Sequence, residues 1–242
     1  MARRLRVFHS PIALGPVTLR GSAFAYAAVV HRARVGQLVE LFDGHGTAGR
    51  GNFTGFEADA LHIEVTEVVV ANDDLRDVRL IQCLGKGDKI DDVLRDACEL
   101  GVKEFVVADA ARSVRKLDAA AGAKLRARLH RIAADTARQA LTPRVANVTG
   151  PLPLLDVFAQ APEPLRLILH PLAPLPFFEA LASAAQGTAI ALAIGPEGGF
   201  TTAEIAGAEA HAWLPVRLGS SVLRTETMGA AALGALRAFD DT

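Results

Sequence analysis

The sequence predicts an α/β protein of two domains, a small β domain over residues 1–72 and a larger α/β domain over residues 73–242. Two observations support this prediction. Short runs of alternating apolar residues, typical of half-buried strands, fill the first part of the chain. From Val78 onward, short apolar runs alternate with longer segments of helical periodicity, which is the pattern of parallel strands joined by helices.

In the first domain, strands are expected over residues 35–42 and 60–70, with a glycine-rich turn over residues 43–52 between them. Within this turn, Gly44-His-Gly-Thr-Ala-Gly49 matches a dinucleotide-binding pattern, which requires a helix at its end. Alternating residues follow it instead, so a β-hairpin is the better interpretation. The domain is therefore expected to be a small barrel or sandwich, and Asn72-Asp73-Asp74 to be the hinge that ends it.

The second domain is expected to begin with a strand–helix–strand unit. Residues 78–84 predict the first strand, residues 90–100 the helix, and residues 104–108 a second, parallel strand. A long helix is expected from about residue 118 to residue 141, and the proline-rich passage after it cannot be helix interior. The remaining expected elements are a strand at 165–170, a helix near 177–185, strands at 189–194 and 213–218, and a helix from 228.

Composition excludes several classes of protein. The net charge is −1 and half of the residues are hydrophobic. The apolar runs are shorter than the roughly 20 residues that span a bilayer, and no apolar segment of a secretory signal follows the N-terminal arginines. Cys83 and Cys98 form neither a Cys-x-x-Cys pair nor a cluster with histidines. We therefore expect a cytoplasmic protein that has no membrane and no metal among its partners.

The positive charge is nevertheless unevenly distributed. No Asp or Glu precedes Glu40, and clustered arginines are typical of proteins that bind a phosphate backbone. The acid-free segment predicts RNA-binding residues at Arg3, Arg4, Arg6, Arg32 and Arg34. A second basic stretch, residues 112–144, contains nine Lys or Arg against two Asp. It could equally be a nucleic-acid surface or the solvated face of a helix.

Two glycine-rich segments in the last third are the strongest functional signal. They are Ile194-Gly-Pro-Glu-Gly-Gly-Phe200 and Leu218-Gly-Ser-Ser-Val-Leu-Arg-Thr-Glu-Thr227, and each follows an expected strand. Open α/β folds bind ligands at such strand ends. Thr201-Thr-Ala-Glu204 is a capping box that should begin a helix directly after the first segment. Neither segment offers a cysteine, a Ser-His pair or a metal cluster, which favours a cradle for a cofactor that carries the reactive group.

These two segments resemble the C-terminal signatures of the 16S ribosomal RNA (uracil-1498-N3) methyltransferases of the RsmE type, in the SPOUT superfamily. The resemblance extends to Lys86-Gly-Asp-Lys-Ile-Asp91, Glu99-Leu-Gly-Val102 and Arg112-Ser-Val114, and to residues 35–44, which are similar to part of that family's PUA-like domain. It implies an N-terminal PUA-like RNA-binding β-barrel, a C-terminal SPOUT α/β domain with a trefoil knot, and a homodimer. The implied partner is the 16S rRNA of the 30S subunit.

The resemblance also implies a cofactor, S-adenosyl-L-methionine, and its contacts. The residues that would bind it are Leu169, Gly195, Pro196, Glu197, Gly199, Leu218, Gly219, Leu223, Thr225 and Thr227. Methylation of uracil N3 requires loss of the N3 proton, and the resulting charge spreads over two carbonyl oxygens. Arg224 is expected to stabilise that charge, and Glu226 to act as the base or to orient it. Glu197 is expected to position the cofactor or its loop.

The sequence departs from the family pattern at Asp96 and, on the long helix, at Asp135, Arg138 and Thr142. Two alternatives stay open, and the departures on the long helix motivate the first. One is a SPOUT methyltransferase that acts on another RNA position. The other is a non-catalytic RNA-binding assembly factor that has kept the fold.

Overall fold

The structure is a computed structural model that describes residues 5–70, 75–114, 116–142 and 144–241. The chain divides into two compact units. Unit 1 comprises Met1–Asp74 with Ala137–Val145, and unit 2 comprises Leu75–Thr136 with Ala146–Thr242. The hinge expected at residues 72–74 lies outside the described residues, so the domain boundary at residue 72 stays a prediction.

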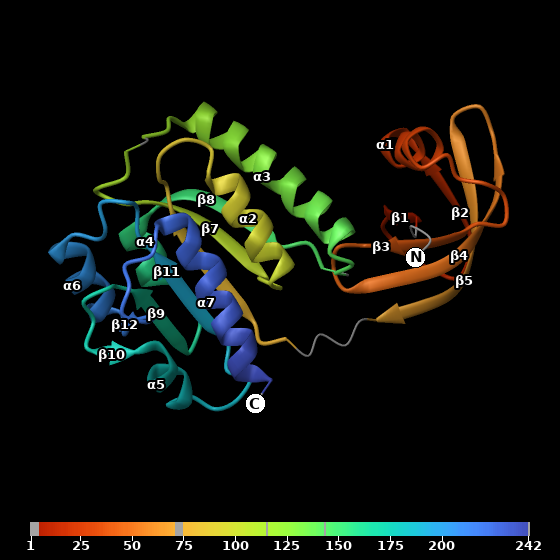
Figure 1. The fold of residues 1–242 in the computed structure, drawn as a ribbon. Helices are drawn as coiled ribbons and strands as arrows, with labels where there is room; N and C mark the ends of the chain where they lie inside the picture. Colours follow the sequence, from red (N-terminus) through yellow and green to blue (C-terminus); the bar gives the residue numbers. More distant parts are fainter. Residues whose placement is uncertain (1–4, 71–74, 115, 143, 242) are drawn as a thin grey trace. The chain divides into compact units, whose positions relative to one another are not determined.

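Unit 1 is built on a five-stranded mixed sheet (Figure 1). Its strands lie in the order β1-β3-β4-β5-β2, with β1 parallel to β3 and the other pairs antiparallel. Among the described residues no pairing of β1 with β2 closes the sheet. The bounds are β1 Leu5–Phe8, β2 Gly15–Arg20, β3 Leu38–Phe42, β4 Thr47–Phe56 and β5 Ala60–Val70, with helical segments α1 Gly21–Ala25 and η1 Tyr26–Val30.

The glycine-rich turn is shorter than the sequence suggested. The hairpin interpretation is confirmed, because β3 and β4 pair in antiparallel fashion. However, β4 begins at Thr47, and the Asp43 carboxylate accepts hydrogen bonds from the amides of His45 and Thr47 at 2.7 and 2.9 Å, which closes a tight turn. The glycines continue into the strand because the neighbouring strand approaches closely. A Cβ on Gly51 would lie 2.2 Å from the carbonyl oxygen of Glu64.

Unit 2 is a three-layer α/β fold with a fully parallel seven-stranded sheet, in the order β10-β12-β9-β11-β6-β7-β8 (Figure 1). The parallel pair predicted at residues 78–84 and 104–108 is confirmed as β6 and β7. The strands are β6 Val78–Cys83, β7 Glu104–Asp109, β8 Asn147–Pro153, β9 Leu165–Leu169, β10 Leu175–Pro176, β11 Ile190–Ile194 and β12 Leu214–Arg217.

The helices of unit 2 follow the predicted periodicity with two differences. A short helix, α4, lies within the proline-rich passage, where Pro153 precedes its first turn and no proline falls inside it. The last helix begins at Thr225, three residues before the predicted start at Met228. The bounds are α2 Ile90–Glu99, α3 Ala119–Gln139, α4 Leu154–Gln160, α5 Phe177–Ala182, α6 Thr202–Ala210 and α7 Thr225–Asp240.

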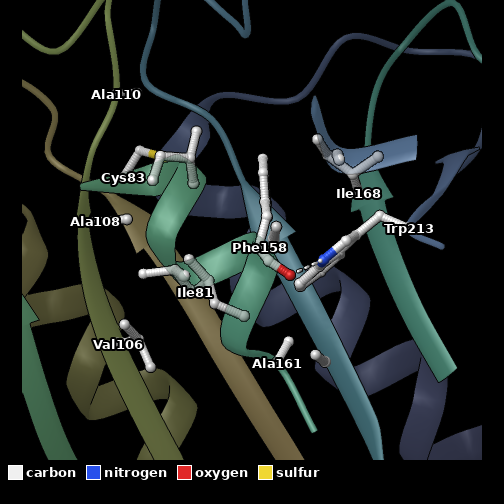
Figure 2. Packing of buried hydrophobic residues seen from close by; sticks show 14 of the residues in the cluster. Ile81, Cys83, Val106, Ala108, Ala110, Phe158, Ala161, Ile168 and Trp213 are labelled. Carbon is white, nitrogen blue, oxygen red and sulfur yellow. Dashed lines mark hydrogen bonds between the residues drawn. The ribbon is translucent and has the colours of Figure 1, made fainter. Parts of the chain in front are cut away.

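Helices cover both faces of the parallel sheet. On one face, α4 and α6 pack over Ile81 and Ala193, and the indole nitrogen of Trp213 donates a 3.1 Å hydrogen bond to the carbonyl oxygen of Phe158 (Figure 2). On the other face, Gly229 of α7 lies against Leu80 and Ile194, which alternate with the residues of the first face. Since β11 is buried along its whole length, the loop that follows it starts from a rigid core strand.

Within the described parts of the chain, no helix combines the length and the apolar character that crossing a membrane requires.

Candidate functional site

A cavity of about 780 Å³ lies at the carboxyl ends of neighbouring strands of unit 2. Its walls come from the segments that follow β6, β9 and β11 and from the segment that leads into α7. Because all strands of the sheet are parallel, these segments meet at one edge, where ligand sites of open α/β folds are found. The cavity therefore lies where the two glycine-rich segments were expected to form a site.

Most of the predicted site residues line this cavity. Both candidate catalytic residues, Arg224 and Glu226, belong to the lining. So do seven of the ten predicted cofactor-binding residues, namely Leu169, Gly195, Pro196, Glu197, Gly199, Leu223 and Thr225. Leu218, Gly219 and Thr227 are not part of it. Further lining residues that the sequence did not single out as site residues include Lys89, His170 and Met228.

The loop after β11 is tied to the loop after β6 through Glu197. The carboxylate of Glu197 accepts a 2.9 Å hydrogen bond from the backbone amide of Lys86. A Cβ on Gly85 would lie 2.9 Å from that carboxylate, so a side chain at this position would displace the Glu197 carboxylate from its place between the two loops. Glu197 thus acts within the protein as a link between loops, and its carboxylate is already engaged.

The same loop is held from a second side by residues that follow β7. The guanidinium of Arg112 donates hydrogen bonds to the carbonyl oxygens of Gly198 and Phe200 at 2.8 and 3.3 Å. The predicted capping box is confirmed at Thr201 and Glu204, and the buried Glu204 carboxylate also accepts a 2.8 Å bond from the amide of Ala111. Burial raises the pKa of Glu204, but the hydrogen bonds from the Thr201 and Ala111 amides outweigh it and hold this pKa below its usual range.

The two glycine-rich segments are joined by a threonine. The hydroxyl of Thr225 donates a 2.6 Å hydrogen bond to the carbonyl oxygen of Gly195. It accepts a 3.0 Å bond from the side-chain amide of Gln82, a buried residue near the end of β6. Segments that are thirty residues apart in sequence thereby meet beside the cavity.

The two candidate catalytic residues differ in their surroundings. Arg224 is exposed, and within the described residues its guanidinium makes no hydrogen bond and no ion pair. Glu226 forms an ion pair with Lys89, the residue that precedes α2. The hydrogen bond from Lys89 is the main reason that the pKa of Glu226 is lowered, and the charges of Lys89 and Arg224 add to it. Glu226 is therefore ionised at neutral pH. Arg224, two residues before it, has a guanidinium that remains available to bind another group.

Two glycines of the first segment are favoured by the local structure of the loop itself. A Cβ on Gly195 would lie 3.2 Å from the ring of Phe200, so the ring packs directly on the backbone. Gly199 has a φ of +68°, which side chains disfavour. The sequence suggested that glycines here admit a ligand, and the structure adds that they let the loop fold back on itself.

More than half of the chain matches a known family. Residues 72–237 match the RNA methyltransferase domain family. The chain belongs to this family.

Full-length relatives give the same result. The ribosomal RNA small subunit methyltransferase E of Mycobacterium bovis is 31% identical over 216 residues, which are 87% of this chain and 82% of that protein. The protein of the same name from Synechocystis is 30% identical over 245 residues, 99% of this chain and 78% of its own length. Similarity to small-subunit RNA methyltransferases therefore extends over both units.

A solved structure has the same fold over nearly the whole chain. It is the ribosomal RNA small subunit methyltransferase E of Neisseria gonorrhoeae, bound to S-adenosyl methionine, with 25% identity and a TM-score of 0.87 over 98% of both chains. A structure from Legionella pneumophila, in complex with the cofactor SAM, has 28% identity and a TM-score of 0.86 over 98% of both chains.

Among the predicted RNA-binding arginines, Arg6 requires a correction. Its side chain is buried, with 3% of the residue exposed, and it pairs with Glu40 at 2.8 Å. Its guanidinium also donates to the carbonyl oxygens of Ala137 and Thr142 at 2.6 and 2.8 Å. All three partners belong to unit 1, so this buried arginine of the methyltransferase stabilises unit 1 and is not exposed for a phosphate contact. Leu5 and Val7 face the core of unit 1, whereas Arg6 lies on the opposite face of β1 and is buried through its contacts with Ala137 and Thr142, which the charge count alone did not consider.

The other predicted arginines fall into two groups. Arg3 and Arg4 lie outside the described residues. Arg32 and Arg34 are exposed, and neither guanidinium has a hydrogen-bond or ion-pair partner in the described part of the chain. By contrast Arg20, which is equally exposed, pairs with Asp59 at 2.7 Å. Of the arginines of unit 1 that the structure describes, Arg32 and Arg34 are thus the best placed for phosphate contacts.

The basic stretch of residues 112–144 has mixed roles. Lys124, Arg126 and Arg131 are exposed on α3 and have no ion pair among the described residues. Arg128 pairs with Asp88 and Asp91. One of the residues at which this helix departs from the family pattern, Arg138, makes a contact within unit 1. Its guanidinium lies 4.1 Å from the centre of the Tyr26 ring.

The residues that sequence reasoning missed are Lys89 as the partner of Glu226, and Gln82. Lys89 lies in a segment that carries the family resemblance, but the sequence does not show which acid it meets. One feature of the sequence marks Gln82 as unusual, because it is a polar residue in the otherwise apolar end of β6. The sequence could flag it as unusual but could not supply its partner, which is 143 residues away.

No group of three or more His, Cys, Asp or Glu that could hold a metal ion occurs among the described residues. Both cysteines are buried and free. Burial raises the pKa of Cys83, and it raises the pKa of Cys98 to about 12, so neither thiol ionises near neutral pH.

Proposed function

We propose that this protein transfers a methyl group from S-adenosyl-L-methionine to N3 of a specific uridine in the 16S rRNA of the small ribosomal subunit, at the position equivalent to uridine 1498. The observation that supports this most directly is the cavity lined by residues of both glycine-rich segments, among them Arg224 and Glu226. The names of the relatives support the small-subunit RNA substrate and the cofactor.

The cavity suits the cofactor in size and chemistry. Its volume of about 780 Å³ lies within the range of small-molecule sites. Apolar side chains of Leu169, Leu223 and Met228 line it together with the backbone of the loop after β11, which fits an adenosine and the methylene chain of a methionine. In this proposal the cofactor contacts are Leu169, Gly195, Pro196, Glu197, Gly199, Leu218, Gly219, Leu223, Thr225 and Thr227.

The residues at the cavity divide the chemistry between them. When bound, S-adenosylmethionine supplies an electrophilic methyl group, and its sulfur keeps the bonding electron pair as the methyl leaves. Arg224 stabilises the negative charge that spreads to O2 and O4 of the uracil when N3 loses its proton. Glu226 accepts that proton. Because Lys89 lowers the pKa of Glu226, this carboxylate is a weak base, and the charge stabilisation by Arg224 has to make N3 more acidic.

The RNA is recognised outside the cavity. We infer that unit 1 is a PUA-like barrel that binds RNA phosphates through Arg32 and Arg34. Arg3 and Arg4, which the sequence also predicts to bind RNA, belong to the same proposal. The target base is then unstacked into the cavity. The proposal also includes a trefoil knot in the domain of residues 73–242 and a homodimer. It places the protein in the cytoplasm, where small subunits are assembled. The domain boundary at residue 72 is part of it.

The test is methyl transfer to 30S subunits and to free 16S rRNA from a strain that lacks this gene, with isotope-labelled S-adenosylmethionine. The RNA is digested and its nucleosides are identified by mass spectrometry. We expect one 3-methyluridine per subunit. A labelled nucleoside other than 3-methyluridine would favour a SPOUT enzyme with another target. Binding of S-adenosylmethionine without transfer to either RNA would favour the non-catalytic factor.

A matched pair of variants tests the assigned roles. Arg224→Ala and Glu226→Gln should each lower turnover by about 10²-fold or more, the usual effect of removing a charge-stabilising group or a base. Their affinity for S-adenosylmethionine, measured by calorimetry without RNA, should stay close to that of the wild type. Near-normal turnover in both variants would exclude these two residues as the catalytic pair.

A further inference from the structure

Gln82 is a buried polar side chain in the middle of the parallel sheet of unit 2. It lies in β6, between the neighbouring strands β11 and β7, and only 3% of it is exposed. Burying an amide is costly, and here the partners belong to the nitrogen alone, because Oε1 is buried without a hydrogen-bond partner in the described part of the chain. It is not among the residues that line the cavity of about 780 Å³, although it borders a smaller pocket that shares Thr225 and Glu226 with that lining.

The hydrogen bonds of Gln82 assign the orientation of its amide. The Thr225 hydroxyl has a single hydrogen, and this points at the carbonyl oxygen of Gly195, 2.6 Å away, which can only accept. The hydroxyl must therefore accept from Gln82, and Nε2 is 3.0 Å from it. The same Nε2 donates to the carbonyl oxygen of Cys83 at 3.2 Å, so both of its hydrogens are used.

These bonds form a relay that runs from β6 through the first residue of α7 to the loop after β11. Thr225 and Gly195 both line the cavity, and each belongs to one of the two glycine-rich segments. The relay is anchored at its buried end in the sheet, where Gln82 is locked by packing and by its bond to Cys83. A rigid anchor of this kind holds both loops at one spacing.

We propose that Gln82 is a positioning residue for the methyl-donor site. Through Thr225 it sets the distance between the loop after β11 and the start of α7, and so prepares the cavity before the donor binds. This inference rests on the proposed function, because it concerns the site assigned there to S-adenosylmethionine. Gln82 itself does not touch the donor.

The test is calorimetric binding of S-adenosylmethionine in the absence of RNA, with two variants that break the relay at opposite ends. Gln82→Met keeps the volume and removes the donor, and Thr225→Val keeps the shape and removes the hydroxyl. Each should weaken binding by about tenfold, the typical effect of one lost hydrogen bond inside a protein. The double variant should bind no worse than Thr225→Val, because both changes break the same relay.

A second readout does not depend on the donor. In the free protein, amide hydrogen exchange at Gly195 and over residues 223–226 should become faster in Gln82→Met. The control is Arg79→Met, on the same strand, which removes a pair with Glu104 and Glu163 outside the cavity lining. It should lower the stability of unit 2 and leave donor affinity unchanged.

The outcomes separate the two proposals. If the wild type does not bind S-adenosylmethionine, the proposed function fails. If the wild type binds S-adenosylmethionine and both Gln82→Met and Thr225→Val bind it with wild-type affinity, the role of Gln82 is refuted while the proposed function stands. An equal loss in Arg79→Met would show that general destabilisation is the cause, and this too would refute it. Should Gln82→Met not fold, Gln82→Leu takes its place, with the same expected loss of donor affinity and the same faster amide exchange.

Discussion

Lys89 and Glu226 form an ion pair between the residue that caps α2 and the first turn of α7. The pair lies in the cavity lining, and the hydrogen bond from Lys89 is the largest cause of the lowered pKa of Glu226. The pKa of Glu226, which the sequence suggested as a base, is thus lowered by Lys89, a residue 137 positions earlier in the chain. This arrangement determines over which pH range the carboxylate is ready to accept a proton.

Replacing Lys89 by methionine should shift the pH dependence of methyl transfer. A nearby cation favours the carboxylate, so its removal raises the pKa of Glu226, and the acidic limb of kcat/KM should move to higher pH. The measurement is a pH profile of wild type and variant on 30S subunits. The control is Arg95→Met, which removes an exposed pair with Asp92 on the same helix. An unchanged acidic limb in Lys89→Met would mean that Glu226 does not titrate in the reaction.

The buried Arg6 should matter for stability and not for RNA binding. Arg6→Met leaves Glu40 without its close partner and two carbonyl oxygens without their donor, which should cost about 3–5 kcal/mol. Thermal unfolding followed by circular dichroism measures this change. At a temperature where the variant is folded, the dependence of RNA affinity on salt should equal that of the wild type. A reduced salt dependence would restore Arg6 as a phosphate contact.

Arg32 and Arg34 should show the opposite behaviour. The double variant Arg32→Ala/Arg34→Ala should fold normally, because both side chains are exposed and make no ion pair within the described residues. If both contact phosphates, the slope of log affinity against log salt should fall by about 0.7–0.9 for each. Arg20→Ala is the matched control, since this exposed arginine already pairs with Asp59. Equal slopes in both variants would place the phosphate contacts elsewhere.

The capping residue Glu204 should make the stability of unit 2 depend on pH. Glu204→Gln loses charge-assisted bonds to the amides of Thr201 and Ala111, which should cost about 1–3 kcal/mol at neutral pH. The folded-state pKa lies below that of the unfolded chain, so this contribution is complete above the unfolded pKa and is lost as the pH falls through the folded value. Denaturant unfolding, followed by the fluorescence of the single tryptophan, Trp213, should show the two proteins converging in acid. A constant difference at all pH values would contradict this.

The two cysteines should be inert in the folded protein. Both are buried, and burial raises the pKa of Cys83 and brings that of Cys98 to about 12. A thiol-reactive aromatic disulfide at pH 8 should therefore label neither, and should label two thiols per chain in denaturant. Fast labelling of either cysteine in the native protein would show local opening of unit 2.

Local sequence signals were sufficient for most of unit 2. The helical spacing of residues 90–100, the capping box at Thr201 and the apolar strands depend on neighbours within a few turns, and each is confirmed. The signals failed where a distant strand decides. The glycines of β4 suggest a turn until Glu64 is known to lie against Gly51. The helix α4 was missed because prolines that flank a short helix look the same as prolines that prevent one.

For the site, the sequence by itself determined the chemical inventory. It supplied two glycine-rich segments after strands, an arginine, two glutamates and a family resemblance that the comparisons confirm. Only the tertiary structure decided how these groups are used. It buried Arg6, engaged Glu197 with a neighbouring loop, paired Glu226 with Lys89 and joined Gln82 to Thr225. The physical reason is that ionisation and positioning depend on distances of a few ångströms between residues that are far apart in the chain.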